Sequence, residues 1–267
     1  MNRLLTFATA SCPDPALACT PRPRPIEREV IGLGLVMAEI EPGGPGVVRL
    51  DFSAAQALTR DDGDEQALLR RFWELVNPGA VRLVSWGGRD RELPMLTQRA
   101  LVYGIPAPGW LRADPRFGLP YRYAQWLHCD LEEWLGNFHP PRPDLARVAR
   151  AVGLPGEFAR LRLKAGHPWE CTPEQIKRYC LGRALLLFGL YLRWALVSGL
   201  IDPQGHNRTL DRWLEALAGG SEPLFAEFLS GWEAAAAGRP RPYQVAEGGF
   251  RLPAQLGGGH LPSEAVL

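Results

Sequence analysis

The most apolar segment of the chain covers residues 179–201 and reads YCLGRALLLFGLYLRWALVSGLI. A membrane-spanning helix needs about 20 consecutive apolar residues, whereas Arg193 ends the uninterrupted apolar run that begins at Ala184. An arginine near the middle of a span costs about 2.5–3.5 kcal/mol on insertion scales. The segment therefore predicts a buried core helix in a protein without a membrane partner, and it raises the question of why Arg183 lies inside it.

Strand and helix patterns alternate along the rest of the chain. Strand patterns cover residues 4–8, 29–40, 46–52 and 80–86, and EPGGPG between the second and third favours an antiparallel hairpin. Helix patterns cover residues 64–76, 92–104, 130–138, 144–154, 172–199, 208–218 and 222–236. This order predicts an α/β fold with a mixed central sheet flanked by helices.

Net charge and cysteine usage narrow the class of protein. The chain has 30 Lys and Arg against 29 Asp and Glu, which argues against a generally basic nucleic-acid-coating protein but leaves a local basic cleft open. Five cysteines without a CxxC pair give little support for a disulfide framework or a structural zinc site. The first apolar run is short for a secretory signal and favours a strand. We therefore expect a cytoplasmic protein.

Two segments carry side chains or turns that bind ligands in other proteins. SWGGRDRELP places a Gly-Gly turn before a helix, where backbone N–H groups bind anions, but it lacks the phosphate-loop and dinucleotide fingerprints. A tight strand-to-helix turn is the simpler interpretation. In HCDLEE, Asp130 as helix N-cap with acids in the first turn explains the acidic cluster. The sequence therefore predicts no metal site there, and no nucleophile motif is present.

Three motifs in order give the chain a resemblance to a known family. LVSWGGRDRELPMLTQRALVYGI is similar to NGRGFDLP followed by L..RAL..GI, and YRYAQWLHCDLEEWL is similar to RY…H.DL.D.L. LARVARAVGLPGE with IKRYCLGRALLLFGLYLRWALVSG is similar to LA..LGLPGK with I..YC..DVLNTYLLYLR…G. On these motifs the chain resembles the predicted 3′–5′ exonucleases related to the proofreading domain of family B DNA polymerases, in the DEDD ribonuclease-H-like superfamily.

The resemblance implies a ribonuclease-H-like fold and four carboxylates that hold two divalent metals, Mg²⁺ or Mn²⁺, at the 3′ end of a nucleic acid. The first two acid positions fall on Ala8 and Ala10, where FATASCPD stands in place of FDIETVPD. The third falls on Glu92, and the fourth on Arg183, four residues after Tyr179. These metals require oxygen ligands, and a cation at 4 Å repels each unit of positive charge by about 4 kcal/mol. We therefore expect no metal cofactor and no intact catalytic site.

What remains of such a site predicts a pseudo-enzyme that binds nucleic acid, DNA or RNA, as a single strand in the former cleft. The candidate contacts are Arg89, Arg91, Tyr179 and Arg183, because guanidinium groups pair well with phosphate. Arg183 also has a structural alternative, an ion pair with Glu92 that neutralises the emptied site. We weigh this ion pair above phosphate binding, although the two can coexist.

Two further interpretations stay open. An active metal-dependent exonuclease would use relocated acids such as Glu92 and Asp130. A scaffold subunit would make no nucleic-acid contact and would offer a protein partner the aromatic residues of the C-terminal helices, although packing on the core is the plainer role for them. These aromatic residues are Trp213, Phe225, Phe228 and Trp232.

The chain divides into three segments on these patterns. Residues 1–200 make up the exonuclease-like domain, residues 201–237 a helical extension packed on it, and residues 238–267 a Gly/Pro-rich tail.

Overall fold

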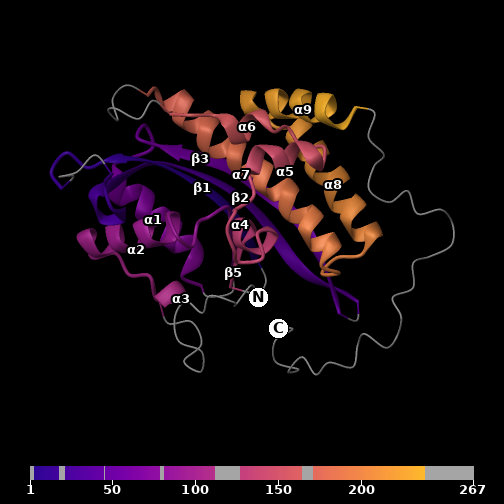
Figure 1. Ribbon diagram of the computed structural model, residues 1–267, viewed down its shortest axis with the longest axis horizontal. Helices are drawn as coiled ribbons and strands as arrows, with labels where there is room; N and C mark the ends of the chain where they lie inside the picture. Colours follow the sequence, from indigo (N-terminus) through magenta and orange to yellow (C-terminus); the bar gives the residue numbers. More distant parts are fainter. Residues whose placement is uncertain are drawn as a thin grey trace.

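Five strands form one mixed sheet in the computed structural model, which describes residues 3–17, 22–44, 46–78, 81–111, 127–163 and 171–237 (Figure 1). β1 (Arg3–Pro13) pairs antiparallel with β2 (Arg28–Gly44), which pairs antiparallel with β3 (Val47–Thr59). β4 (Val81–Ser85) is parallel to β1, and β5 (His128–Asp130) is parallel to β4. The order β3-β2-β1-β4-β5 is that of the ribonuclease-H-like fold, so the expected fold class is confirmed. The predicted tail, 238–267, lies outside the described residues.

Helices cover both faces of the sheet (Figure 1). On one face, α1 (Glu65–Val76) and α2 (Glu92–Tyr103) pack against Leu5 and Phe7 of β1. On the other face, α7 (Pro173–Val197) and the helices around it pack against Leu4. The remaining helices are η1 (Pro25–Glu27), α3 (Pro108–Leu111), α4 (Leu131–Leu135), α5 (Leu145–Ala151), α6 (Glu157–Arg160), α8 (Pro203–Ala218) and α9 (Pro223–Ala236).

Helix α7 contains most of the apolar segment 179–201. Thr172 caps it, because its hydroxyl accepts from the backbone N–H of Gln175 while the Gln175 side chain accepts from the N–H of Thr172. By length and composition alone α7 is apolar enough to cross a membrane, but 78% of its most apolar window is buried inside the fold. This burial agrees with the predicted core helix.

The backbone of α7 lies directly on β2. A Cβ atom added to Gly34 would meet the carbonyl oxygen of Cys180 at 2.1 Å, and one added to Gly32 would meet Ile176 Cγ2 at 2.3 Å. Only glycine permits this approach, because any other residue would push the helix off the sheet. Gly34 and Gly32 pair with Ala8 and Ala10 of β1. The close contact therefore fixes α7 against the positions where the family has its first two acids.

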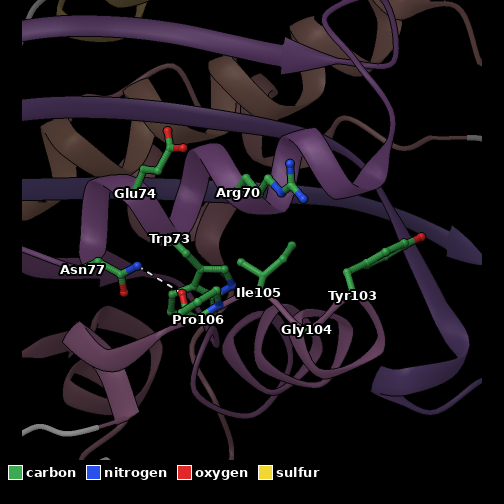
Figure 2. A pocket seen from close by; sticks show the side chains of 8 residues that line it. All are labelled: Arg70, Trp73, Glu74, Asn77, Tyr103, Gly104, Ile105 and Pro106. Atoms are coloured by element: carbon green, nitrogen blue, oxygen red, sulfur yellow. Dashed lines mark hydrogen bonds between the residues drawn. The ribbon is translucent and has the colours of Figure 1, made fainter.

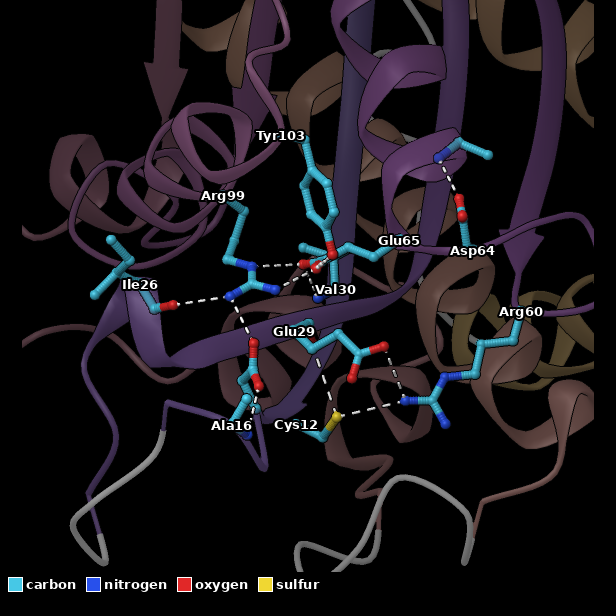
Figure 3. A network of polar contacts seen from close by, with 12 residues as sticks. Cys12, Ala16, Ile26, Glu29, Val30, Arg60, Asp64, Glu65, Arg99 and Tyr103 are labelled. Carbon is cyan, nitrogen blue, oxygen red and sulfur yellow. Dashed lines mark hydrogen bonds and ion pairs between the residues drawn. The ribbon is translucent and has the colours of Figure 1, made fainter.

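A buried polar network connects the end of β1 to α1 and α2 (Figure 3). Arg99 of α2 is 2% exposed and forms ion pairs with Glu65 of α1 and with Asp14, whose Oδ2 lies 2.8 Å from Arg99 Nη1. The Tyr103 hydroxyl donates to Glu65 Oε2 at 2.8 Å, and the backbone N–H of Val30 donates to Glu65 Oε1 at 2.7 Å. Asp14 ends the segment FATASCPD, and Arg99 lies in LVSWGGRDRELPMLTQRALVYGI. The fold brings these two separate segments into contact.

Helices α8 and α9 bury their aromatic side chains against α7 and β3. Trp213 and Phe228 are 0% exposed, with ring centroids 5.7 Å apart, and Phe225 is 9% exposed. Trp232 packs on Trp213 at 5.6 Å and is half-buried. Among the described residues, Trp213, Phe225 and Phe228 therefore belong to the core, and Trp232 packs against it. Packing on the core is the simpler of the two roles expected for these side chains, the other being contact with a protein partner. The domain division at residue 200 stays a prediction.

Candidate functional site

The first two acid positions are apolar and enclosed. Ala10 packs with Ile176 and Cys180 of α7, so its side chain faces that helix, and Ala8, two residues earlier on β1, faces the same way. Both alanines are 2% exposed. This part of the site therefore offers neither a ligand atom nor an open space beside the strand.

Glu92, at the third acid position, is the first residue of α2 and closes the edge of β1. The pairing of β1 with β4 ends at Thr6, and Glu92 Oε1 then accepts from the backbone N–H of Thr9 at 2.8 Å and from its hydroxyl at 3.2 Å. Burial raises the pKa of Glu92 to about 7, against the opposing effect of the Thr9 hydrogen bonds and of the Arg183 and Arg91 charges. The carboxyl group is thus half-protonated near neutral pH.

Stability should depend on pH through Glu92. The pKa of Glu92 is higher in the folded protein than the usual 4.5, so its protonated carboxyl group stabilises the folded state. This contribution to the free energy of unfolding is complete below the usual pKa and is lost as the pH rises through about 7. Glu92→Gln keeps an acceptor for Thr9 but cannot ionise. Between about pH 4 and about pH 8, its free energy of unfolding should rise relative to wild type by up to about 3 kcal/mol. Urea unfolding of both proteins across this range measures the difference.

A matched control is Glu74→Gln, because the Glu74 side chain is 64% exposed on α1. Its difference from wild type should stay constant across the same pH range. A Glu92→Gln difference that is equally independent of pH would show that the Glu92 carboxyl group ionises as readily in the folded protein as in the unfolded chain.

Arg183 lies near Glu92 but does not pair with it, so the predicted ion pair is wrong. Its Nη1 donates to the carbonyl oxygen of Ala159 at 3.2 Å, and its guanidinium carbon lies 5.3 Å from the ring centroid of Tyr179. Glu92 is already bonded to Thr9, so each member of the expected pair has other partners. Arg183 is half-buried, and its charge lowers the pKa of Glu92 without direct contact.

Arg91 occupies the space that a longer side chain at position 87 would take. Gly87 stands where the family has asparagine, with φ of 67°, and a Cβ there would lie 1.8 Å from Arg91 Nη2 and 2.5 Å from Glu132 Oε2. Arg91 donates to the carbonyl oxygen of Trp86 at 3.1 Å and pairs with Glu132 at 3.4 Å. Its side chain is 59% exposed, so it remains accessible at the surface.

Arg89 and Asp130 form their hydrogen bonds inside the fold. Arg89 Nε donates to Glu133 at 2.9 Å, and the Arg89 side chain is only 11% exposed. Asp130 is 1% exposed and accepts from the backbone N–H groups of Gly87 at 2.7 Å and of Arg89 at 2.9 Å. The backbone amides of Gly87 and Arg89 at the Gly-Gly turn are therefore used by Asp130, as the tight-turn interpretation requires, and the Arg89 side chain is bonded to Glu133 and to the carbonyl oxygen of His128.

The metals that the resemblance implies do not fit these residues. The four acid positions supply one carboxylate, Glu92, beside the cation of Arg183, and the oxygens of Asp130 are bonded to backbone amides. Across the part of the chain that the structure describes, no three His, Cys, Asp or Glu side chains are grouped to hold a metal ion. Glu92 and Asp130, the candidates for relocated acids, do not belong to such a group among the described residues.

Two residues that sequence reasoning did not select, Thr9 and Ala159, contact the site. Thr9 lies between the two alanines and donates twice to Glu92, while Ala159 offers only its backbone carbonyl to Arg183. The structure also buries a hydrogen bond of 2.7 Å between Ser85 and His128 behind the Gly-Gly turn. Both side chains are at most 1% exposed, so this pair is closed to a substrate.

A separate pocket of about 260 Å³ lies on the other face of the sheet, between α1 and the end of α2 (Figure 2). Trp73 and Tyr103 form its walls, and Asn77 Nδ2 donates to the carbonyl oxygen of Pro106 at 3.0 Å across one end. It contains none of the candidate residues. The sheet separates it from Arg183.

Comparisons with known proteins found a matching family model and a similar solved structure. A family model described as "Predicted 3'-5' exonuclease related to the exonuclease domain of PolB" matches residues 47–232. Among solved structures, the chain is similar to the family B DNA polymerase from the hyperthermophilic archaeon Pyrobaculum calidifontis, with 17% sequence identity and a TM-score of 0.45. This similarity covers 89% of the chain and 27% of the polymerase. A search of curated proteins found no match.

Proposed function

The chain belongs to the family of predicted 3′–5′ exonucleases related to the exonuclease domain of PolB, and from this premise we propose that it has lost two-metal catalysis and binds nucleic acid in the former cleft. The observation that carries the proposal is the set of side chains at the acid positions. Ala8 and Ala10 are enclosed, Glu92 is bonded to Thr9, and the last position holds the cation Arg183.

The charge of the cleft supports binding of a phosphate group without a metal. In a two-metal site the metal charges neutralise the carboxylates and attract the phosphate. Here Arg183 supplies positive charge directly, and one of its N–H groups is bonded to Ala159. Arg91, whose side chain is 59% exposed and pairs with Glu132, adds an accessible cation. A guanidinium group matches phosphate geometry well, so these two residues can replace the metal-phosphate contact.

Replacing Arg183 with glutamate tests this proposal. The affinity for a labelled single strand should fall at least tenfold, and the slope of log affinity against log salt should decrease by about one, because one phosphate contact is lost. Fluorescence anisotropy at several salt concentrations measures both quantities. DNA and RNA strands of the same sequence are compared in the same experiment.

Arg71→Glu is the matched control, because Arg71 is half-exposed on α1, across the sheet from Arg183. It makes the same change in net charge and should leave the affinity nearly unchanged. Equal losses in the two variants would point to non-specific attraction by the whole surface. Absence of binding at low salt in the wild type would favour a scaffold role without nucleic acid.

A further inference from the structure

The outer edge of β3 presents backbone groups to a possible neighbour. β3 is the last strand on its side of the sheet, and it pairs with β2. In an antiparallel ladder, both backbone groups of every second residue point to the same side. Those of Thr59 point outward, because its N–H donates to Asp62 Oδ2 at 2.8 Å and its carbonyl oxygen accepts from the N–H of Asp62 at 3.0 Å. The alternation therefore directs the N–H and C=O groups of Ala57 and Ala55 outward as well.

The outward groups of Ala55 and Ala57 are free in the described chain. Earlier in β3, beyond the irregular pairing between residues 52 and 54, the carbonyl oxygen of Leu50 accepts from the hydroxyl of Thr209 in α8. Among the described residues, no backbone or side-chain partner reaches the outward groups of Ala55 and Ala57. The free part of the edge therefore lies between the contact with α8 and the turn after β3.

The sequence of this free edge does not discourage pairing with another strand. Residues 53–59 read SAAQALT, without a charged residue or a proline, and these are the residues that usually protect an edge strand from pairing. Ser53 is exposed, and residues 54–58 are half-buried. The free N–H and C=O groups of Ala55 and Ala57 therefore form a template for one more strand.

The free edge is complementary to itself. If two copies of β3 run antiparallel about a twofold axis at Gln56, Ala55 of each copy lies opposite Ala57 of the other, and each such pair exchanges both of its N–H···O bonds. Gln56 then faces the Gln56 of the second copy, and every pair within residues 53–59 is uncharged. The side-chain nitrogen of Gln56 has no acceptor among the described residues. A second Gln56 brings an amide oxygen to the same edge.

Charges beyond the paired residues also match between two copies. The turn after β3, residues 60–64, reads RDDGD and has one arginine against three aspartates. In the antiparallel arrangement this turn lies beside the first half of the second β3. There Arg49 is exposed, and Arg212 of α8 is 60% exposed and pairs with Asp51, so the cations exceed the acid by one. The twofold axis repeats this contact at the other end, which favours a second copy over an unrelated strand.

We propose that two copies of this chain associate through residues 53–59 of β3, so that their sheets join into one continuous sheet. The inference goes beyond nucleic-acid binding and does not depend on it. With neighbouring strands about 4.8 Å apart, the two β1 strands would lie about 24 Å apart. The twofold axis would place both former acid sites on the same face of the joined sheet. A contact of one strand from each copy is small, so we expect affinity in the micromolar range or weaker.

Disulfide cross-linking of the full-length chain tests the register. At a non-hydrogen-bonded antiparallel pair the two Cα atoms lie about 4.5 Å apart, which a disulfide spans. Gln56→Cys should therefore form a covalent dimer with oxidised glutathione on a non-reducing gel. Ser53→Cys is the matched control, because Ser53 is exposed on the same strand but its two copies would lie about 20 Å apart. It should give no more dimer than wild type.

Ala57→Pro tests the backbone hydrogen bonds. Proline removes an N–H group that has no partner in the described chain, so the monomer should stay folded while the pairing is lost. In sedimentation velocity from about 1 to about 100 μM, wild type should shift from 29.5 kDa toward twice that mass. Ala57→Pro should remain a monomer with an unchanged circular dichroism spectrum. High salt should weaken the wild-type dimer, because its charged ends are exposed.

The cross-linking pair decides the proposal even if Ala57→Pro fails to fold. A covalent dimer of Gln56→Cys without one of Ser53→Cys supports the register. Equal dimer in both variants would indicate random collision, and no dimer in either would show that this edge stays unpaired or takes another strand; both results overturn the inference. A wild-type dimer that persists in folded Ala57→Pro would place the contact elsewhere and overturn it too.

Discussion

Replacing Arg99 with alanine is expected to lower the free energy of unfolding by about 3–5 kcal/mol, because removing one partner of a buried ion pair leaves the other charge uncompensated. Arg99 and Glu65 are both 2% exposed at their side chains, and Asp14 is 14% exposed. After the substitution, Glu65 would keep only the hydrogen bonds from Tyr103 and Val30. Urea unfolding followed by circular dichroism measures the loss.

Arg71→Ala provides the comparison for Arg99→Ala. Arg71 pairs with Glu74 at 3.9 Å, with side chains 49% and 64% exposed, and an exposed pair of this kind contributes at most about 0.5 kcal/mol. A loss below about 1 kcal/mol in Arg99→Ala would mean that water or a rearranged Glu65 side chain replaces the buried network. The account of how Asp14 and the end of β1 are held in place would then be wrong.

Helix ends were the most predictable part of the fold, because their signals are local. Thr172 followed by Pro173 marks the start of α7, and the structure shows the capping hydrogen bonds that this pattern implies. The helix expected over residues 92–104 ends at Gly104, which adopts the left-handed conformation that glycine tolerates best. In each case the residues that decide the conformation are neighbours in the sequence.

Strand limits were less predictable, because they depend on pairing with distant residues. β5 has only three residues, and it exists because His128 and Asp130 pair with β4 more than forty residues earlier. The segment that contains it was assigned to a helix from Asp130 onward, which is correct for α4 alone. β1 and β3 also run beyond their expected limits, to Pro13 and Thr59, because β2 is long enough to pair with both.

The composition of the site could be predicted from the sequence, but its contacts could not. Alignment of motifs is enough to place alanines and arginine at the acid positions. It gives no information on Thr9, whose backbone N–H is left without a strand partner where β4 ends and is taken up by Glu92. The predicted pairing of Glu92 with Arg183 failed for this reason, because both residues find partners that only the folded chain provides.

Loss of metal binding is the prediction with the largest consequence for function. A metal ion at the family site would have one carboxylate, Glu92, and would face the positive charge of Arg183. With an effective dielectric constant of about 20, that repulsion alone is about 8 kcal/mol for a divalent ion at 4 Å. The comparison variant restores the acids at all four positions, as Ala8→Asp, Ala10→Glu, Glu92→Asp and Arg183→Asp. Because Ala8 and Ala10 are 2% exposed, its fold must be checked by circular dichroism first.

Calorimetric titration of the wild-type protein with Mn²⁺ and Mg²⁺ is the most direct test of whether two-metal catalysis has been lost. We expect no saturable heat from a site tighter than millimolar, and no shortening of a labelled single strand in the same buffer. Metal-dependent heat is expected only in a folded acid-restored variant. A wild-type site tighter than millimolar, together with strand shortening that EDTA abolishes, would contradict the account and identify the chain as a working exonuclease.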